Sequence, residues 1–415
     1  MAYFTGDEDD HWAVAVYNDV VYFSNGVEVL SSWNGTDSFI TKPVTGWTAY
    51  AAKQLLNFGN RLVAFHTVES GTPKPKRVRW SKNGTATDTT SPGAGFADIE
   101  DAIFDDVIVS AEYIERDVII YGKKNTVLMQ HQNDPNEPFT FTKRIPEKGI
   151  LGQRCTTSLG NSIATLFFDG IFGYSGGTER EDVASNINNE LLRILSPQYI
   201  NRSFVVHDEF NKEVLFYIPL VGSERPGTYF RLLLDNGSWS RGARSYTGWG
   251  TYELQSGETW DEDGDTWDSD PTRWDDSSNT QLTPLIIYGD ASGRTYLDDP
   301  TIKNLDGAAI DGWFETKDFG VLDAQGNWLE NVSWEGIRFY ARGDSVKVYY
   351  STDFGTTYTE LGDSPATLTS LWAMYEMNFQ ATGRHIRFKY RNSTTSSGFE
   401  VKAIRPGYQK LSDSP

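Results

Sequence analysis

Residues 259–276 combine carboxylates and tryptophans at a regular spacing, and such side chains could bind a metal ion or a glycan. Tryptophan recurs every seven positions there, at Trp260, Trp267 and Trp274, and Asp follows each one. Between residues 261 and 276 eight acidic residues stand against one arginine, a net charge of −7 (one minus eight) out of the chain's −20. Ca²⁺ prefers hard carboxylate oxygens. The candidate ligands around Gly264 are Asp261, Asp263, Asp265 and Asp268.

Three interpretations of this acidic Trp loop compete. As a calcium loop it lacks one ligand, because the twelfth position counted from Asp261 is Thr272, where such a loop carries Glu. As an aromatic platform, its three Trp rings could contact glycans. As a solvated loop, it would pack those rings onto its own fold or onto a neighbouring subunit. We expect no cofactor, with calcium as the open alternative.

A second acidic group could suit a glycosidase, which needs two facing carboxylates at a defined separation. Its members are Asp98, Glu100, Asp101, Asp105 and Asp106. The sequence shows no Ser-His-Asp signature, no Gly-rich phosphate loop and no metal-binding His pair. We therefore expect no enzymatic activity, and a propeller glycosidase or lyase remains an alternative.

The histidines and the single cysteine are expected to be structural. Four histidines lie in or beside strand-like runs, at His66, His131, His207 and His385. Cys155 has no second cysteine to pair with. Stability must therefore come from packing, and a reducing cytoplasm is a natural place of synthesis.

The elements that position these side chains are short strands joined by hairpins. Residues 163–168 meet residues 171–174 across Asp169-Gly170, for example, and residues 20–23 and 27–30 meet across Asn25-Gly26. Apolar runs rich in β-branched and aromatic residues, cut by Gly, Asn and Asp, are typical of such hairpins. Groups of three or four strands recur every 40–50 residues or so, which predicts an all-β fold with a β-propeller of five to seven blades.

The chain divides into two predicted domains. Residues 1–311 form the propeller, with the acidic Trp loop and a short helix near 185–195, capped by Ser185 or Asn186 and ended by Ser196-Pro197. Residues 312–415 alternate apolar and polar side chains, which predicts a jelly-roll-like β-sandwich. Its wet faces carry four cations that could dock an acidic partner: Arg338, Lys347, Arg387 and Lys389.

Composition limits the classes of partner. A formal net charge of −20 argues against tight binding of nucleic acid, because phosphate binding needs Lys and Arg to displace counterions. No apolar run approaches the roughly 20 residues of a membrane span. The first ten residues have no basic or long apolar region, so we expect no secretory signal peptide.

Several segments resemble a family of tailed-bacteriophage structural proteins. They are residues 79–81, 95–100, 118–121 with 126–128, 139–141, 149–152, 168–174, the helix before Leu195, and 288–296. The family comprises the tail hub or nozzle proteins of short-tailed phages, also called packaged-DNA stabilisation proteins. The resemblance covers roughly residues 75–300, and no catalytic residue travels with it.

The resemblance implies a β-propeller body with added sandwich material, assembled as a ring on the tail axis. It implies a homo-oligomer, most simply a hexamer, located in the virion tail and synthesised in the host cytoplasm. Other tail proteins on the adaptor or portal side, and fibres or a tail tip, would be its partners, and double-stranded DNA would pass through without tight binding. A tail-associated protein that binds a receptor or glycan is the alternative function.

Overall fold

The computed structural model describes residues 4–132, 134–145, 148–252, 284–298, 304–305, 307–321, 332–394 and 398–410. The acidic Trp loop lies outside these residues, together with all the side chains proposed for it: Trp260, Trp267, Trp274, Asp261, Asp263, Asp265 and Asp268.

The chain forms two compact units, Met1–Asp298 and Asp299–Pro415. The predicted boundary after residue 311 is therefore too late. The short hairpin of β22 (Asn304–Leu305) and β23 (Ala308–Ala309) falls in the second unit. Each unit is described by itself below.

The first unit contains six consecutive antiparallel sheets in its described part, which we call blades 1 to 6. In each blade every strand pairs with its neighbour in sequence. Blade 1 has β1 (Ala13–Tyr17), β2 (Val20–Ser24) and β3 (Ser31–Trp33); blade 2 has β4 (Tyr50–Asn57), β5 (Leu62–Glu69), β6 (Thr72–Trp80) and β7 (Gly95–Asp98); blade 3 has β8 (Ile108–Ile114), β9 (Asp117–Gly122), β10 (Thr126–His131) and β11 (Phe139–Lys143). Blade 4 has β12 (Thr156–Ser158), β13 (Ile163–Phe167) and β14 (Gly170–Tyr174); blade 5 has β15 (Phe204–Asp208), β16 (Glu213–Pro219), β17 (Pro226–Leu233) and β18 (Trp239–Gly242); blade 6 has β19 (Gly248–Tyr252), β20 (Leu285–Gly289) and β21 (Thr295–Leu297).

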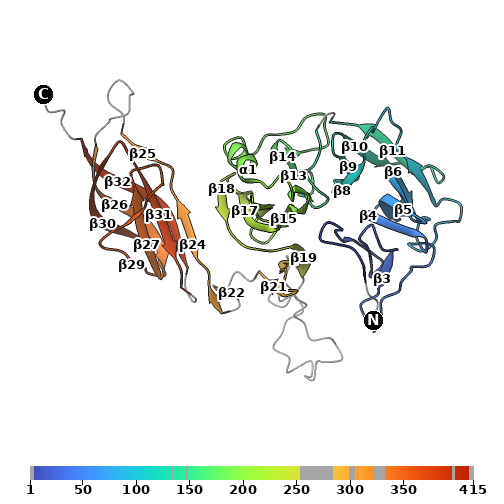
Figure 1. Cartoon of the computed structure of the whole chain (residues 1–415), viewed down its shortest axis with the longest axis horizontal. Helices are drawn as coiled ribbons and strands as arrows, with labels where there is room; N and C mark the ends of the chain where they lie inside the picture. Colours follow the sequence, from blue (N-terminus) through green and yellow to red (C-terminus); the bar gives the residue numbers. More distant parts are fainter. Residues whose placement is uncertain are drawn as a thin grey trace, which may run out of the picture. The chain divides into compact units, whose positions relative to one another are not determined.

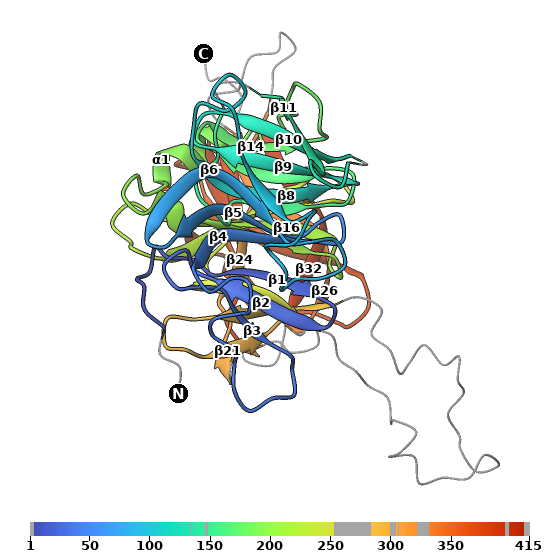
Figure 2. The same ribbon diagram turned by 90° about the vertical axis from the view of Figure 1, so that its right-hand side faces the viewer.

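The blades follow one another around the unit in chain order, from blue to orange (Figure 1). The first strands of successive blades contact each other from β1 through β4, β8 and β12 to β15. The buried clusters lie between blades, so blade 2 is packed on both faces, against blade 1 and blade 3. Figure 2 shows the same order, with β4, β5 and β6 between β1–β2 and β8–β9. This arrangement confirms the predicted all-β, propeller-like body.

Local sequence explains where these strands turn. In blade 4, β13 and β14 pair from Ile163↔Tyr174 to Phe167↔Gly170, so the hairpin forms as predicted, but its two-residue turn is Phe168-Asp169, one position before Asp169-Gly170. Gly170 has φ +132°, a conformation that L side chains rarely adopt. In blade 5 every residue of β16 is buried, as expected for a central strand with packed neighbours on both faces.

Two local predictions were wrong. Residues 27–30 do not form a strand, because the Asn25 side-chain oxygen accepts hydrogen bonds from the backbone N–H groups of Val27 and Glu28 (3.1 and 2.8 Å). This turn competes with the strand ladder, and the third strand of blade 1 starts later, at Ser31.

The helix α1 (Asn188–Ile194) is shorter than predicted. It follows Ile187 with no side-chain cap, so neither Ser185 nor Asn186 caps it. A 3₁₀ turn, η1 (Ile200–Arg202), then leads into β15.

The second unit is a β-sandwich. One sheet has the order β24 (Gly312–Glu315), β31 (His385–Asn392), β27 (Ser345–Ser351) and β28 (Thr359–Glu360), with β25 (Phe319–Gly320) on β31 and β29 (Ala366–Thr367) on β27. The other has the order β30 (Ala373–Gly383), β26 (Val332–Gly343) and β32 (Phe399–Lys410). One core joins the two sheets, with Trp334 and Phe339 from β26 against Phe388 and Tyr390 from β31. No helix among the described residues is long and apolar enough to cross a membrane.

Candidate functional site at the propeller axis

The first strands of blades 4, 5 and 6 run between two pockets, one at each of their ends. The arginine pocket, about 240 Å³, is lined by Glu8, His11, Arg154, Arg202, Arg225, Pro226, Thr247 and Ala291. The glutamate pocket, about 280 Å³, is lined by Glu112, Thr157, Ser158, His207, Glu209, Trp249, Thr251, Pro284 and Ile286. In blade 4, for example, Arg154 precedes β12, whereas Ser158 ends it. The two pockets therefore lie at opposite ends of the innermost strands.

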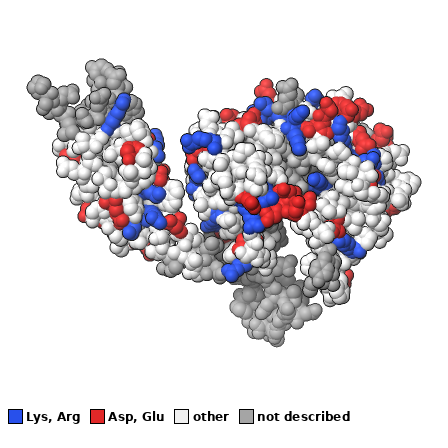
Figure 3. All heavy atoms as spheres, viewed as in Figure 1, with Lys and Arg blue, Asp and Glu red and all other residues white. Residues whose placement is uncertain are grey.

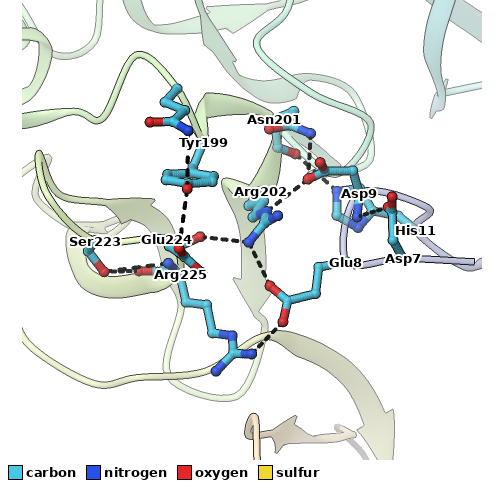
Figure 4. Close-up of polar contacts among 11 residues, drawn as sticks. Asp7, Glu8, Asp9, His11, Tyr199, Asn201, Arg202, Ser223, Glu224 and Arg225 are labelled. Atoms are coloured by element: carbon cyan, nitrogen blue, oxygen red, sulfur yellow. Dashed lines mark hydrogen bonds and ion pairs between the residues drawn. The ribbon is translucent and has the colours of Figure 1, made fainter.

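The N-terminal segment, residues 7–11, fastens blade 1 to blade 5 at the arginine pocket (Figure 4). The Arg202 guanidinium donates to Asp9 (Nε to Oδ1, 2.8 Å) and to Glu8 (Nη1 to Oε2, 2.6 Å). Glu8 also pairs with Arg225, so one carboxylate bridges two arginines. The hydrogen bond from Arg225 lowers the pKa of Glu8, and the hydrogen bond from Arg202 lowers the pKa of Asp9. Both carboxylates are therefore ionised.

His11 adds an uncharged contact between the N-terminal segment and blade 5. Its ring is buried, and its Nε2 lies 3.1 Å from the Asn201 carbonyl oxygen, so Nε2–H donates. Burial and, to a smaller extent, the positive charge of Arg154 lower the pKa of His11 to about 4. The imidazole is uncharged near neutral pH and contributes a hydrogen bond rather than a charge.

Arg154 differs from the other two arginines of the pocket. Its backbone is fixed beside β15, because its carbonyl accepts from the N–H of Val205 (2.8 Å). Its Nη1 donates to the Thr247 carbonyl (2.7 Å), but its Nε is buried without a partner among the described residues. Burial lowers the pKa of Arg154 to about 10, and no carboxylate pairs with it in the described structure. The pocket thus holds one guanidinium whose charge is not matched.

The glutamate pocket offers a different chemistry. Glu112 projects from β8, and its Oε1 accepts from the backbone N–H of Tyr113 (3.0 Å). Burial raises the pKa of Glu112 to about 7. Trp249 and the hydroxyls of Thr157 and Ser158 line the same space. Such a pocket can hold an uncharged polar group against one aromatic face.

The four cations predicted as docking residues lie on the sandwich, each with a carboxylate partner. Arg387 makes two bonds to Asp318, both 2.9 Å, and Lys389 lies 3.4 Å from Glu315. Arg338 pairs with Glu376 (3.1 Å) and Lys347 with Glu360 (3.3 Å). Because their charges are matched within the chain, they offer less net attraction to an acidic partner than the sequence suggests.

Four of the five carboxylates of the second acidic group are also engaged structurally. Asp98 forms a two-point ion pair with Arg77 (2.8 and 2.6 Å), and Asp101 and Asp105 pair with Lys76. The Asp106 carboxylate accepts hydrogen bonds from the backbone N–H groups of Val107, Lys124 and Asn125.

The histidines and the cysteine occupy varied positions. His66 lies 2.8 Å from the Ile108 carbonyl, and the His385 ring stacks on Phe354 at 3.6 Å. His131 packs edge-on against Phe139, whereas His207 lines the glutamate pocket. Burial raises the pKa of the Cys155 thiol to about 12, which leaves it unreactive. No group of three His, Cys, Asp or Glu side chains suited to a metal occurs among the described residues.

Sequence reasoning missed both axial pockets. His11, Arg154 and Arg202 each lie within two residues of an innermost strand's start, yet they are far apart along the chain. The recurrence of charged or polar residues just before the first strand of successive blades was the one signal that could have pointed to them.

Comparisons with known proteins give distant matches only. No family model matches the chain, and no curated protein matches it. Among solved structures, the designed Ika8 protein is 10% identical over 69% of each chain, with a TM-score of 0.35. BamB from Moraxella catarrhalis is 11% identical over 69% of this chain and 72% of its own (TM-score 0.31). An exo-β-1,3-galactanase from Phanerochaete chrysosporium is 9% identical over 95% of each (TM-score 0.27). Similarities of this size carry no functional argument.

Proposed function

We propose that this chain is a structural subunit of a bacteriophage tail. In this role it is a ring-forming hub or nozzle that extends the DNA conduit and helps to retain and then release the genome. Its partners are further copies of itself and other tail proteins. The observation that carries the proposal is an apolar sheet face on blade 1 that stays largely exposed in the described structure, although the Phe4 ring packs against Trp12 and Phe23.

That face follows from the alternation of β1. Ala13, Ala15 and Tyr17 point into the core shared with blade 2. Val14 and Val16 point the other way, and each is 55% exposed. A strand with apolar residues on both faces is typical of a sheet that is packed on both sides.

Neighbouring strands extend the face. Val14 lies opposite Phe23, and Val16 lies opposite Val21, which lies opposite Trp33. The Trp12 ring contacts the Phe23 ring, with centroids 5.7 Å apart. We call this surface the blade 1 outer face: Trp12, Val14, Val16, Val21, Phe23 and Trp33. No buried cluster among the described residues joins it to blade 6. Contiguous exposed apolar surface of this kind marks a protein interface.

A second copy of the chain is the proposed occupant. A ring needs head-to-tail contacts between two different surfaces of one subunit. The sandwich offers the second surface, where Leu371 is 78% exposed and Met374 is 62% exposed. Arg342 and Lys402 lie over the Trp372 ring beside them, whereas residues 7–10, just before Trp12, are acidic. Both surfaces are thus apolar, and their charges add little, because Arg342 is paired with Glu400 while Glu8 and Asp9 are paired with Arg202 and Arg225.

DNA would pass between the copies rather than through one chain. The larger axial pocket, about 280 Å³, equals a cube with sides of roughly 7 Å, whereas the major groove of a duplex alone is about 12 Å wide. On the visible surface of the first unit acidic and basic side chains are interspersed (Figure 3). With a net charge of −20, such a surface disfavours tight phosphate binding.

Charged substitutions on the two surfaces test the proposal. Val16→Arg and Leu371→Arg should each reduce a ring to monomers in native mass spectrometry, because either one buries an unpaired charge in the contact. Val27→Arg is the matched control, since Val27 is 50% exposed but lies in a turn outside the face. A wild-type protein that is monomeric in assembled particles, or one that forms peripheral trimers by cryo-EM, would contradict the ring.

The glutamate pocket favours one second candidate, a tail-associated glycan-binding protein. Trp249 supplies an aromatic face, and Thr157, Ser158 and a Glu112 carboxyl whose pKa burial raises to about 7 supply hydrogen bonds. Binding of host oligosaccharides that is lost on Trp249→Ala would favour this function over the conduit.

A further inference from the structure

Several arginines of this chain hold a carboxylate through two hydrogen bonds, whereas Arg154, like Arg61, has no carboxylate partner among the described residues. Arg77, Arg387 and Arg391 each direct their Nε and Nη2 edge at one carboxylate, with bonds of 2.6–2.9 Å to Asp98, Asp318 and Asp311. This two-point geometry is the strongest interaction that an arginine makes with an anion. Arg154 makes no ion pair within the described residues, and its one hydrogen bond is to a backbone carbonyl.

Arg154 lies where anionic ligands could reach it, because it lines a pocket. Arg154 lines the arginine pocket together with Arg202 and Arg225, so three guanidinium groups share about 240 Å³. The carboxylates of Glu8 and Asp9 engage Arg202 and Arg225. Neither pairs with Arg154. Leaving a largely desolvated cation without a counter-charge is costly, so the pocket favours an added negative charge next to Arg154.

We propose that the arginine pocket binds a small oxyanion, a phosphate or a carboxylate, with Arg154 as its principal ligand and Arg202 and Arg225 as secondary ligands. The volume suits a small ion and excludes a nucleic acid strand. The site goes beyond the proposed tail function, and it would exist whether or not the chain forms a ring.

Glu8 makes the proposal sharper, because it is a built-in competitor. Its carboxylate bridges Arg202 and Arg225, and an incoming anion must share those arginines with it. Removing the Glu8 charge should therefore strengthen anion binding, whereas removing the Arg154 charge should weaken it. A purely structural role for Arg154 predicts neither effect on binding.

Isothermal titration of the full chain at pH 7.5 and constant ionic strength tests this inference, with inorganic phosphate in one arm and succinate in the other. We expect saturable binding in at least one arm, and the stronger arm identifies the ligand chemistry. Arg154→Met should weaken that binding at least about tenfold, the loss expected for charged hydrogen bonds. Glu8→Gln should strengthen it several-fold. Arg338→Met, a matched arginine on the sandwich, should change nothing.

Two results would overturn the inference: no saturable binding of either anion to the wild-type chain, or equal binding by the wild type and Arg154→Met. If Arg154→Met fails to fold, Glu8→Gln and the anion-induced rise in the melting temperature of the wild type decide the matter. Unchanged anion affinity in Glu8→Gln would then contradict it.

Discussion

Two titratable residues at the propeller axis respond to pH in opposite senses. Burial raises the pKa of Glu112 to about 7 and lowers the pKa of His11 to about 4. In the unfolded chain these groups return to ordinary values near 4.3 and about 6.5. Each difference makes the free energy of unfolding depend on pH, because the folded and unfolded states bind different numbers of protons.

For Glu112 the folded state binds the proton more tightly than the unfolded state. Its contribution is therefore fully present below pH 4.5 and is lost as the pH rises through about 7. We expect Glu112→Gln, which keeps the hydrogen-bonding shape without the charge, to be more stable than the wild type by about 2 kcal/mol at pH 8. The two should have nearly equal stability at pH 4.5. Urea unfolding at both pH values measures this, and an equal gain at both would contradict the assignment.

For His11 the sign is reversed. The folded state resists protonation, so stability is fully present above pH 6.5 and is lost as the pH falls towards about 4. Between pH 6.5 and 4 we expect the free energy of unfolding of the wild type to fall by about 2–3 kcal/mol more than that of His11→Gln. The Gln amide can still donate to the Asn201 carbonyl. Parallel pH slopes for the two proteins in urea unfolding would exclude the effect.

Helix α1 packs closely against blade 4 at Gly170. The Asn188 side-chain oxygen accepts from the N–H of Ile171 (2.9 Å), which brings the amide group of Asn188 against Gly170. A Cβ at Gly170 would lie 2.4 Å from the Asn188 side chain, at a backbone φ of +132°. We expect Gly170→Ala to lower the free energy of unfolding by about 2–3 kcal/mol, from strain and overpacking together.

Gly177→Ala is the control for this substitution. A Cβ at Gly177 meets nothing within 4 Å, and its φ is not in the left-handed region. Thermal unfolding of both variants should show a large decrease for Gly170→Ala and almost none for Gly177→Ala. Equal effects would mean that the contact with Asn188 does not matter.

Elements were predictable from sequence where their determinants are local. The blade 4 hairpin depends on two adjacent turn residues, and the prediction matches β13 and β14 closely. Residues 27–30 failed because the side chain of Asn25 forms a turn that periodicity cannot reveal. The arginine pocket was beyond reach for another reason, since Glu8, Arg154 and Arg202 meet only after the blades have closed around the axis.

At the scale of the whole molecule, the two units have separate cores. The buried cluster of the sandwich draws all its members from residues 321–390, and the other clusters lie within Met1–Asp298. We expect a chain that ends after Asp298 to remain folded and soluble but to fail to form rings, because it lacks the Leu371–Met374 surface. Circular dichroism checks that the truncated chain remains folded, and native mass spectrometry checks that it no longer forms rings. A truncated protein that still enters virions at normal copy number would show that the sandwich is not the docking unit.

The ion pairs between the N-terminal segment and blade 5 have a mechanical consequence. The cores that join successive blades are apolar, whereas the segment that ties blade 1 to blade 5 is held by Glu8, Asp9 and two arginines. A pulling force applied at the N-terminus would load the Phe4 contacts with Trp12 and Phe23, then these few ion pairs, and only afterwards the core between blades 1 and 2. Because exposed ion pairs are screened by salt and apolar contacts are not, the force needed to peel the segment away should fall with ionic strength. The N-terminal segment would then come away from blade 5, while the apolar core keeps blade 1 joined to blade 2.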